Sequence, residues 1–590
     1  MMVLPARDHL LRVDLSTESV ERVAVPEQWR RRYVGGKGLG ARYLYEELDA
    51  GTDPLGPDNV LLLVLGPVSG VLPGEDRYAA VTKSPLTGGF LDSYGGGDFP
   101  SALAGAIGDA IAILISGQAD RPVQLVVEDG TARIEPTDTW GEDTVAVDEQ
   151  FPDAAVACIG PAGESRVAYA TIASDAGEHH AGRGGAGAVM GAKRLKTVVA
   201  RGDPPSGLEA LREQYAERYA ESDTGQWLET SGTVETVDFA NATGVLPTRG
   251  WQDGAFEGTA EIGVAAVREL AREREYDDEN DAQPGGFRVE TDSGESVPRG
   301  ATAMSLGAGL GIDDGRAVAD LGGLCDRLGI DLISAGSAVA WAIRASDEGR
   351  LERSLRFGDP AQARDLLSEI AARDSPLGDV LADGVSAAVE RFGGDDLVPT
   401  VKAMELPAYD PRGAQSMALA YATSDRGACH RRAMPVEDEV FEAWDVAQTV
   451  EAVVCEQDQS AVLWSLIIDD FVGDVFDDLG AEWLDAVGLD TEGSLRTVGE
   501  RIWTLTRLFN VREGFSRADD ALPAVLGQPL ESGPNKGQAV DEDRFEAMLD
   551  AYYETRGWGP DGRPTHDTVQ RLGLAACVDD QTPLAGQVEE

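Results

Sequence analysis

The chain of 590 residues has the length of about two to four domains, and its 42% hydrophobic content excludes a largely disordered protein. Its 104 acidic and 50 basic residues give a formal net charge of −54, which argues against a nucleic-acid partner because phosphate contacts need clustered Lys and Arg. No apolar run approaches the ~20 residues of a membrane span, and no basic segment followed by an apolar one opens the chain, so we expect a cytoplasmic protein outside the membrane.

The first third of the chain has the pattern of β-structure with many glycine turns. Residues 60–65 and 111–115 are continuous apolar runs of strand length. Residues 123–127 and 131–134 flank the pair Asp129-Gly130, which suits a tight turn. These two segments predict a hairpin.

Beyond a Gly- and Pro-rich boundary at 201–207 the pattern becomes helical. Residues 276–300 are acidic and contain glycine, which predicts an irregular surface insertion. Apolar residues recur at three- and four-residue spacing in four segments, 209–219, 260–275, 317–328 and 334–346.

The pattern as a whole predicts an α+β chain. A β-rich N-terminal domain is expected over 1–203, followed by two mainly α-helical domains over 204–403 and 404–590. The third of these opens with Gly- and Pro-bearing loops near Met404 and then continues helically.

The acidity itself needs a physical cause, since so many carboxylates repel one another in dilute buffer. The basic residues are 44 Arg and six Lys. In molar salt the Debye length falls to about 3 Å and the repulsion is screened. We interpret the acidity as halophilic, an adaptation to a salt-rich cytosol; a binding surface for a basic partner is the alternative.

The five cysteines are scattered along the chain, and the nearest pair, Cys429 and Cys455, is 26 residues apart. No CxxC pair is present, which argues against a zinc ribbon, a thioredoxin motif or a compact iron–sulfur motif. We expect plain buried thiols.

Glycines gather in three clusters that also carry basic residues, at 35–41, 83–97 and 181–191. Glycine lets a backbone approach a ligand closely. The third cluster contains a GxGxxG, but it does not follow the first predicted strand directly, as a nicotinamide site requires. We favour a phosphate-bearing ligand held by Arg77, Arg183 and the neighbouring lysines. Plain turns of a β-rich domain are the alternative.

Two later segments carry candidate chemistry. Asp326 and Asp331 stand around a glycine at a predicted helix break, where they could accept hydrogen bonds from the N–H groups of a heterocycle or simply be solvated. His430, one of five histidines, lies in a loop of small residues and is the best candidate for proton transfer near neutral pH. A structural histidine is the alternative.

Nine segments, in order along almost the whole chain, together resemble the tungsten-dependent aldehyde ferredoxin oxidoreductase family. They are GGKGLGA (35–41), TKSPLTGG (82–89), DSYGGGDF (92–99), AGRGGAGAVMGAKRLK (181–196), DRLGIDLIS (326–334), ELPAYDPRG (405–413), YATSDRGACH (421–430), FNVREGFSRADD (509–520) and RGWGPDGRPT (556–565).

This resemblance implies an N-terminal domain that cradles tungsten, or molybdenum, held by two pterin dithiolenes, so that no protein side chain ligates the metal. It implies oxidation of an aldehyde to its carboxylic acid, with electrons passed to ferredoxin or another carrier, and a possible homodimer. His430 matches the family's catalytic histidine. The positions that would bind the cofactor are Arg77, Tyr94, Gly95, Gly96, Arg183, Gly184, Gly185, Asp326, Ile330, Asp331, Arg426 and Arg432.

The chain departs from the family pattern at several positions. The first three cysteines of the family's [4Fe–4S] cluster would fall near residues 276–281, where there is no Cys, and Asp469 stands where the fourth belongs. Trp464 stands where a pterin-binding Asp belongs, and Tyr94 where an asparagine is usual. The usual active-site glutamate falls at Ala301 or Ala303. A carboxylate is a poor substitute for thiolate, so we predict that the cluster is missing.

Two hypotheses follow. The first is an aldehyde oxidoreductase that has lost its cluster and passes electrons to a separate carrier, such as an iron–sulfur partner protein. The second is a catalytically silent paralogue that serves as a pterin-binding or assembly subunit. The retained His430, Arg183 and first carboxylate motif favour the first hypothesis; Trp464 and the missing glutamate favour the second.

Overall fold

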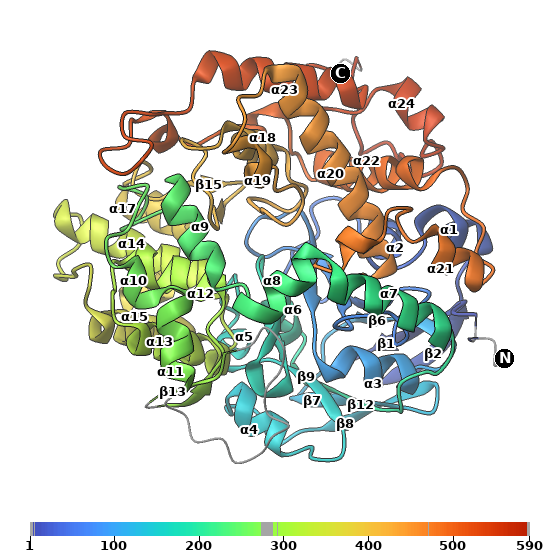
Figure 1. Cartoon of the computed structure of the whole chain (residues 1–590). Coiled ribbons are helices and arrows are strands. Elements are labelled where there is room, and N and C mark those ends of the chain that lie inside the picture. The colour runs from blue at the N-terminus through green and yellow to red at the C-terminus, as the bar shows by residue number, and fades with distance from the viewer. Residues whose placement is uncertain (1–3, 5, 273–286, 292, 470, 587–590) are drawn as a thin grey trace. The chain divides into compact units, whose positions relative to one another are not determined.

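The computed structural model describes residues 4, 6–272, 287–291, 293–469 and 471–586. Figure 1 shows the chain coloured from blue at the N-terminus to red at the C-terminus. By their internal contacts the residues divide into two compact units. The first unit consists of Met1–Gly225, Cys455–Ala518 and Tyr553–Glu590, and the second of Gln226–Val454 and Asp519–Tyr552. A β-rich N-terminal part followed by helices confirms the predicted α+β class. The predicted domain boundaries at 203/204 and 403/404 stay predictions.

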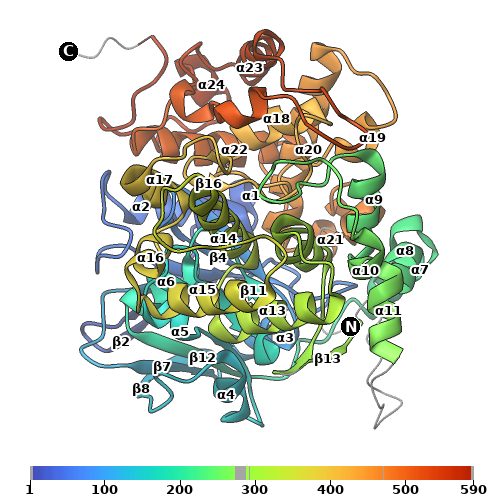
Figure 2. The ribbon, with the colours of Figure 1, turned by 90° about the vertical axis from the view of Figure 1, so that its left-hand side faces the viewer.

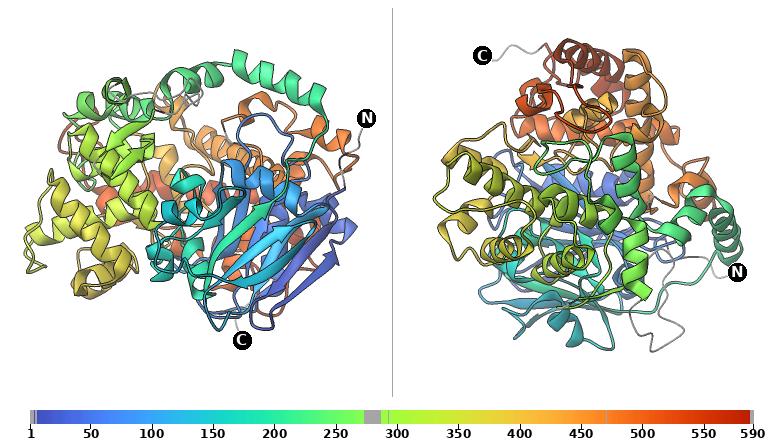
Figure 3. Two further views of the ribbon diagram at one scale, coloured as in Figure 1. Left: turned by 90° about the horizontal axis from the view of Figure 1, so that it is seen from below. Right: turned by 60° about the vertical axis from the view of Figure 1, so that its left-hand side comes forward.

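The first unit contains two six-stranded sheets (Figure 3, left). The pairs β1–β6 and β7–β12 are parallel and the other neighbours antiparallel. The first sheet has the order β2 (Ser19–Ala24), β1 (His9–Asp14), β6 (Ala110–Ser116), β3 (Leu61–Val64), β4 (Tyr78–Lys83) and β5 (Phe90–Gly95). The second has the order β11 (His179–Ala181), β10 (Ile172–Ser174), β9 (Ala155–Cys158), β12 (Leu195–Arg201), β7 (Val123–Glu128) and β8 (Thr131–Pro136).

The central strands are buried on both faces, which explains their continuous apolar sequence. In β3, Leu61 and Leu63 belong to a core shared with the second sheet. Leu62 and Val64 belong to another core that includes residues of α2 (Gly36–Glu47) and α22 (Leu495–Arg512). The predicted strands at 60–65 and 111–115 and the hairpin after residue 123 are therefore confirmed as β3, β6 and β7–β8.

The first glycine cluster, 35–41, serves packing in the first unit. It opens α2, where a Cβ on Gly40 would lie 2.6 Å from a methyl group of Val81 in β4. A Cβ on Gly36 would lie 2.1 Å from the carbonyl oxygen of Trp464, near the end of α20 (Val446–Leu466). These glycines let α2 contact its neighbours through its backbone.

Helices complete the first unit. They are α1 (Glu27–Tyr33), α3 (Asp98–Ala106), α4 (Thr144–Glu149), α5 (Pro161–Glu164), α6 (Ala186–Ala192), α7 (Glu209–Glu221), α21 (Ala481–Ala486) and α24 (His566–Arg571). The predicted helix over 209–219 is confirmed as α7.

The second unit is mainly helical. Its helices α13 (Gly315–Leu328), α14 (Leu332–Asp347) and α15 (Pro360–Ala372) pack on one another (Figure 2), and the first two confirm the predicted helices at 317–328 and 334–346. The others include α9 (Glu235–Thr243), α16 (Pro376–Leu381), α17 (Val385–Phe392), α18 (Gln415–Thr423) and α19 (Val436–Glu439).

Two predictions in this unit were wrong in detail. Of the helix expected over 260–275, residues 273–275 lie outside the described ones. The rest is divided at Gly263 into α10 (Thr259–Ile262) and α11 (Val264–Arg272), because the Asp238 carboxylate accepts a hydrogen bond from the Val264 N–H at 3.0 Å and starts a new helix. In the insertion expected over 276–300, residues 276–286 lie outside the described ones. The next residues form a two-stranded sheet, β13 (Val289–Thr291) with β14 (Gly294–Ser296).

None of the described helices combines the length and apolar character needed to cross a membrane.

Candidate functional site

In the first unit, the turn between β11 and α6 has an unusual backbone. Arg183, Gly184 and Gly185 have φ values of 68°, 68° and 89°, so three successive residues are left-handed. Serine hydroxyls hold the turn against the first sheet: Ser93 in β5 donates to the Gly182 carbonyl oxygen, and Ser84 after β4 donates to that of Gly184, both at 2.7 Å. A left-handed backbone at a residue other than glycine costs conformational free energy, and strained residues of this kind are frequent at ligand-binding sites.

The glycines predicted to approach a cofactor have close neighbours within this chain. A Cβ on Gly96 would lie 2.6 Å from the carboxyl carbon of Glu75, and one on Gly185 would lie 2.2 Å from the Ala168 carbonyl oxygen. A Cβ on Gly95 would meet the Tyr78 ring at 2.5 Å. Internal packing is therefore sufficient to explain glycine at these positions.

Arg77 lies between two carboxylates of the first unit. Its Nη2 is 2.7 Å from a Glu75 oxygen and 3.4 Å from a carboxylate oxygen of Asp469. Glu75 also accepts a bond from the Gly97 N–H and lies 2.7 Å from Nδ1 of His179. Asp469, at the predicted place of a cluster cysteine, thus makes an ion pair with an arginine.

The other predicted residue of this region, Tyr94, stacks on Trp464. The two rings lie 3.8 Å apart with an interplanar angle of 25°. The Tyr94 hydroxyl donates to Asp92, whose carboxylate is 3.1 Å from Nζ of buried Lys37. Two of the positions at which the chain departs from the family pattern therefore contact each other.

The lysines beside the glycine turns bind carboxylate or carbonyl oxygens within the first unit. Lys37 binds Asp92, Lys83 pairs with Glu513 at 2.5 Å, and Lys196 pairs with Glu164. Lys193 donates to the Gly117 carbonyl at 3.0 Å, and burial lowers its pKa to about 8. Their ammonium groups are therefore engaged within the unit, and the hypothesis that they bind phosphate stays a prediction.

In the second unit, Asp326, Ile330 and Asp331 lie at the break between α13 and α14. Gly329, with φ of 66°, ends α13. Asp331 caps α14, because its carboxylate accepts a hydrogen bond from the Ser334 N–H at 2.8 Å. The predicted helix break is thus confirmed, whereas its role in cofactor binding stays a prediction.

His430 lies half-buried in the loop that follows α18. Arg432 pairs with Asp425 at 3.3 Å, and Arg426 donates to the sulfur of Cys429 at 3.0 Å. These contacts join the two arginines predicted for the site to the loop that carries the histidine. They hold the loop from both sides of His430.

Sequence reasoning missed Tyr409 as a functional candidate. Its ring meets the imidazole of His430 edge to face at a centroid distance of 5.9 Å, and burial raises its pKa to about 12, so the phenol stays protonated. Its φ of 51° is rare for an aromatic residue. The motif at 405–413 contains Tyr409, but no local pattern relates it to a histidine 21 residues later.

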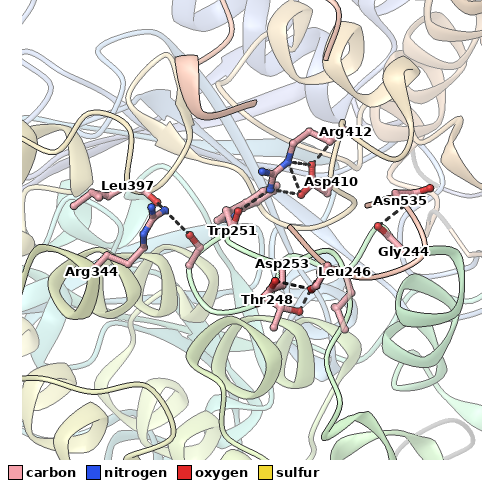
Figure 4. Close-up of polar contacts among 12 residues, drawn as sticks. Gly244, Leu246, Thr248, Trp251, Asp253, Arg344, Leu397, Asp410, Arg412 and Asn535 are labelled. Atoms are coloured by element: carbon pink, nitrogen blue, oxygen red, sulfur yellow. Dashed lines mark hydrogen bonds and ion pairs between the residues drawn. The ribbon is translucent and has the colours of Figure 1, made fainter. Parts of the chain in front are cut away.

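A buried ion pair between Asp410 and Arg412, drawn in Figure 4, directly follows Tyr409 in the sequence. Arg412 binds Asp410 through Nη2 at 2.6 Å and through Nε at 2.9 Å, and it donates to the Trp251 carbonyl oxygen at 2.7 Å. The Arg412 and Asp410 side chains are 3% and 0% exposed. This pair therefore supports the strained Tyr409 backbone.

Residues 10–202 match the family model "Aldehyde ferredoxin oxidoreductase, N-terminal domain", and residues 210–574 match the model of domains 2 and 3. The chain therefore belongs to the aldehyde ferredoxin oxidoreductase family, a family of oxidoreductases.

Two tungsten-containing aldehyde ferredoxin oxidoreductases, from Pyrococcus abyssi and Pyrococcus furiosus, are 34% identical to it, over 96% of this chain and 99% and 98% of theirs. The WOR-like subunit of an aliphatic sulfonate oxidoreductase of Pyrococcus furiosus is 27% identical over 96% of each chain. The active-site complex BamBC of benzoyl coenzyme A reductase with 1,5-dienoyl-CoA has the same fold, with a TM-score of 0.81, 22% identity and 98% coverage of both chains.

One buried hydrogen-bond donor of the first unit suits a cofactor whose oxygen atoms accept hydrogen bonds. Nε of Arg77 is buried and has no hydrogen-bond partner among the described residues. A buried donor of this kind is costly unless a ligand satisfies it. The strained turn at 183–185 lies in the same unit. These observations fit an anionic cofactor there, although the glycines themselves do not require one.

Proposed function

We propose that the chain oxidises an aldehyde to a carboxylic acid at a tungsten (or molybdenum) pterin centre and passes the electrons to ferredoxin or another carrier. The observation that carries this proposal is the loop of His430. In this loop Arg432 pairs with Asp425 and Arg426 donates to the sulfur of Cys429. The protonated phenol of Tyr409 lies beside the His430 imidazole. The tungsten-containing relatives support the same chemistry.

The reaction converts an aldehyde and water into an acid with release of two protons and two electrons. The bound cofactor would accept the electrons. His430 is half-buried, so it is accessible to a substrate, and a neutral imidazole accepts one of the protons as the aldehyde C–H bond breaks. The Tyr409 hydroxyl, kept protonated, is a donor suited to the carbonyl oxygen of the substrate.

We propose that the cofactor is held by the residues the resemblance implied. These are Arg77, Tyr94, Gly95, Gly96, Arg183, Gly184, Gly185, Asp326, Ile330, Asp331, Arg426 and Arg432. The cytoplasmic location, the salt-rich environment, the homodimer and the carrier protein stay predictions.

Metal analysis and an activity assay test the function. Protein produced with tungstate and molybdate and purified at high salt is expected to hold about one of these metals per chain and to reduce a dye when aldehyde is added. A folded protein that holds neither metal and shows no dye reduction would instead support the silent paralogue. The Tyr94–Trp464 stack is the observation that favours this second candidate.

The same preparation is expected to contain no [4Fe–4S] cluster. Asp469 pairs with Arg77, and a carboxylate engaged in this way is a poor ligand for iron–sulfur chemistry. The other three ligand positions predicted near 276–281 fall outside the described residues and contain no Cys. Iron analysis should therefore give a value near zero. Four irons per chain, with the absorbance of a cluster, would refute this prediction.

A further inference from the structure

The imidazole of His179, in β11, lies between two carboxylates of the first unit. Its Nδ1 atom is 2.7 Å from Oε1 of Glu75, and its Nε2 atom is 3.9 Å from Oδ2 of Asp175. The imidazole is 12% exposed and each carboxylate side chain is 25% exposed, so water screens these contacts only in part. When the imidazole is protonated, both ring nitrogens carry a proton and the ring forms an ion pair with each carboxylate.

The turn before α3 fixes the two carboxylates. Glu75 accepts a hydrogen bond from the Gly97 N–H at 3.2 Å, and Asp175 accepts one from the Asp98 N–H at 3.0 Å. Gly97 has φ of 85°, and a Cβ there would lie 2.9 Å from Cδ2 of His179 and collide with the Asp175 carboxylate. The glycine therefore makes room for the imidazole and its two partners.

Glu75 connects His179 to Arg77. One oxygen of Glu75 faces the imidazole, and the other, Oε2, is 2.7 Å from Nη2 of Arg77. The same Nη2 is 3.4 Å from Oδ1 of Asp469, so two carboxylates face a single guanidinium. An anionic ligand that accepts from the Nε atom of Arg77 would meet their combined negative charge. A further positive charge on His179 reduces this repulsion.

The net charge of this group of residues depends on pH. Histidine side chains change charge between about pH 5 and pH 8, and burial raises the pKa of Asp175 to about 6. Both changes have the same sign: as the pH rises, the imidazole loses its positive charge and Asp175 gains a negative one. The charged side chains nearby are Glu75 and Arg77 before β4, Asp98 in α3, Asp148 in α4, Asp175 and Glu178 before β11, and Asp469 after α20.

We propose that His179 is a positioning residue for the anionic cofactor: in its protonated form it holds Glu75, and through Glu75 it holds the Arg77 guanidinium in the arrangement that binds an anion. A unit charge about 10 Å away, at an effective dielectric constant of about 20, changes the affinity for an anion by about tenfold. Cofactor binding is therefore expected to weaken as the pH rises. This inference rests on the proposed function, since it concerns the cofactor of the same enzyme.

The loss of metal as a function of pH tests the proposal. Protein loaded with tungsten or molybdenum is dialysed at one salt concentration between about pH 5 and pH 8, and the metal per chain is measured over time. The wild-type rate of loss is expected to rise about tenfold across this range. A rate that does not change with pH would overturn the inference and leave the proposed function in place. Wild-type protein that never contains either metal would overturn the proposed function and this inference with it.

Matched variants assign the dependence to His179. His179→Gln keeps a hydrogen-bond donor but carries no charge, so it should lose metal faster than the wild type at low pH and at an equal rate at high pH. The dependence that remains, due to Asp175, should disappear in His179→Gln/Asp175→Asn.

The control is His9→Gln, because His9 also contacts two carboxylates of the first unit, Asp8 at 2.6 Å and Asp109 at 3.7 Å. It should keep the wild-type dependence on pH. A circular-dichroism melt at each pH confirms that the variants fold. Wild-type behaviour of His179→Gln, or a dependence lost in His9→Gln, would refute the assignment.

Discussion

Replacing His430 with alanine is expected to lower the rate of aldehyde-dependent dye reduction by about 10²- to 10⁴-fold, the usual contribution of a positioned acid–base group. The tungsten and pterin contents should stay at the wild-type level, because no cofactor contact is assigned to the imidazole. Steady-state kinetics and metal analysis on the same preparation check both halves of this prediction.

The matched control is His566→Ala, which removes an exposed imidazole from α24. Its rate should equal that of the wild type. If His430→Ala also turned over at the wild-type rate, His430 would be a structural residue. If it lost the metal together with the activity, its role would be to bind the cofactor instead.

Replacing Asp410 with asparagine is expected to lower the free energy of unfolding by about 3–5 kcal/mol, because it leaves the buried guanidinium of Arg412 without a counter-ion. Asparagine keeps the shape of the side chain and can still accept from the Arg412 N–H, which is 2.9 Å from the Asp410 carboxylate. Denaturant titration of both proteins at one salt concentration measures the difference.

An exposed ion pair of the same unit provides the control. The side chains of Arg272 and Glu269 are 74% and 70% exposed and 3.3 Å apart, so Glu269→Gln should change the stability by about 0–1 kcal/mol. The double variant Asp410→Asn/Arg412→Met should recover part of the loss, since it removes the uncompensated charge. Equal small losses in the buried and exposed variants would contradict the argument.

Periodicity and turn chemistry predicted the local structure well. The apolar run at 60–65 predicted a strand and Asp129-Gly130 predicted a hairpin turn, and both are found, because these signals lie within a few adjacent residues. The division at Gly263 was missed because it depends on Asp238, which lies 25 residues earlier in the chain.

The environment of the candidate site was less predictable, because its contacts join distant parts of the chain. Lys83 is adjacent to a glycine turn in the sequence, yet its partner Glu513 is 430 residues away. The stack of Tyr94 on Trp464 is similarly remote. His430 could be selected from a loop of small residues, whereas Tyr409 beside it has no signal in the sequence. The motif resemblance named residues expected to share a site, but it predicted none of these contacts.

The burial of most lysine side chains has a practical consequence for handling this protein. All six lysines are in the described part of the chain. Lys536 is exposed, the Lys402 side chain is 1% exposed, and the other four are buried, namely Lys37, Lys83, Lys193 and Lys196. Among the described lysines, reagents that acylate primary amines would therefore react mainly with Lys536. Molecules coupled to an electrode or resin through the Lys536 side chain would share nearly the same orientation.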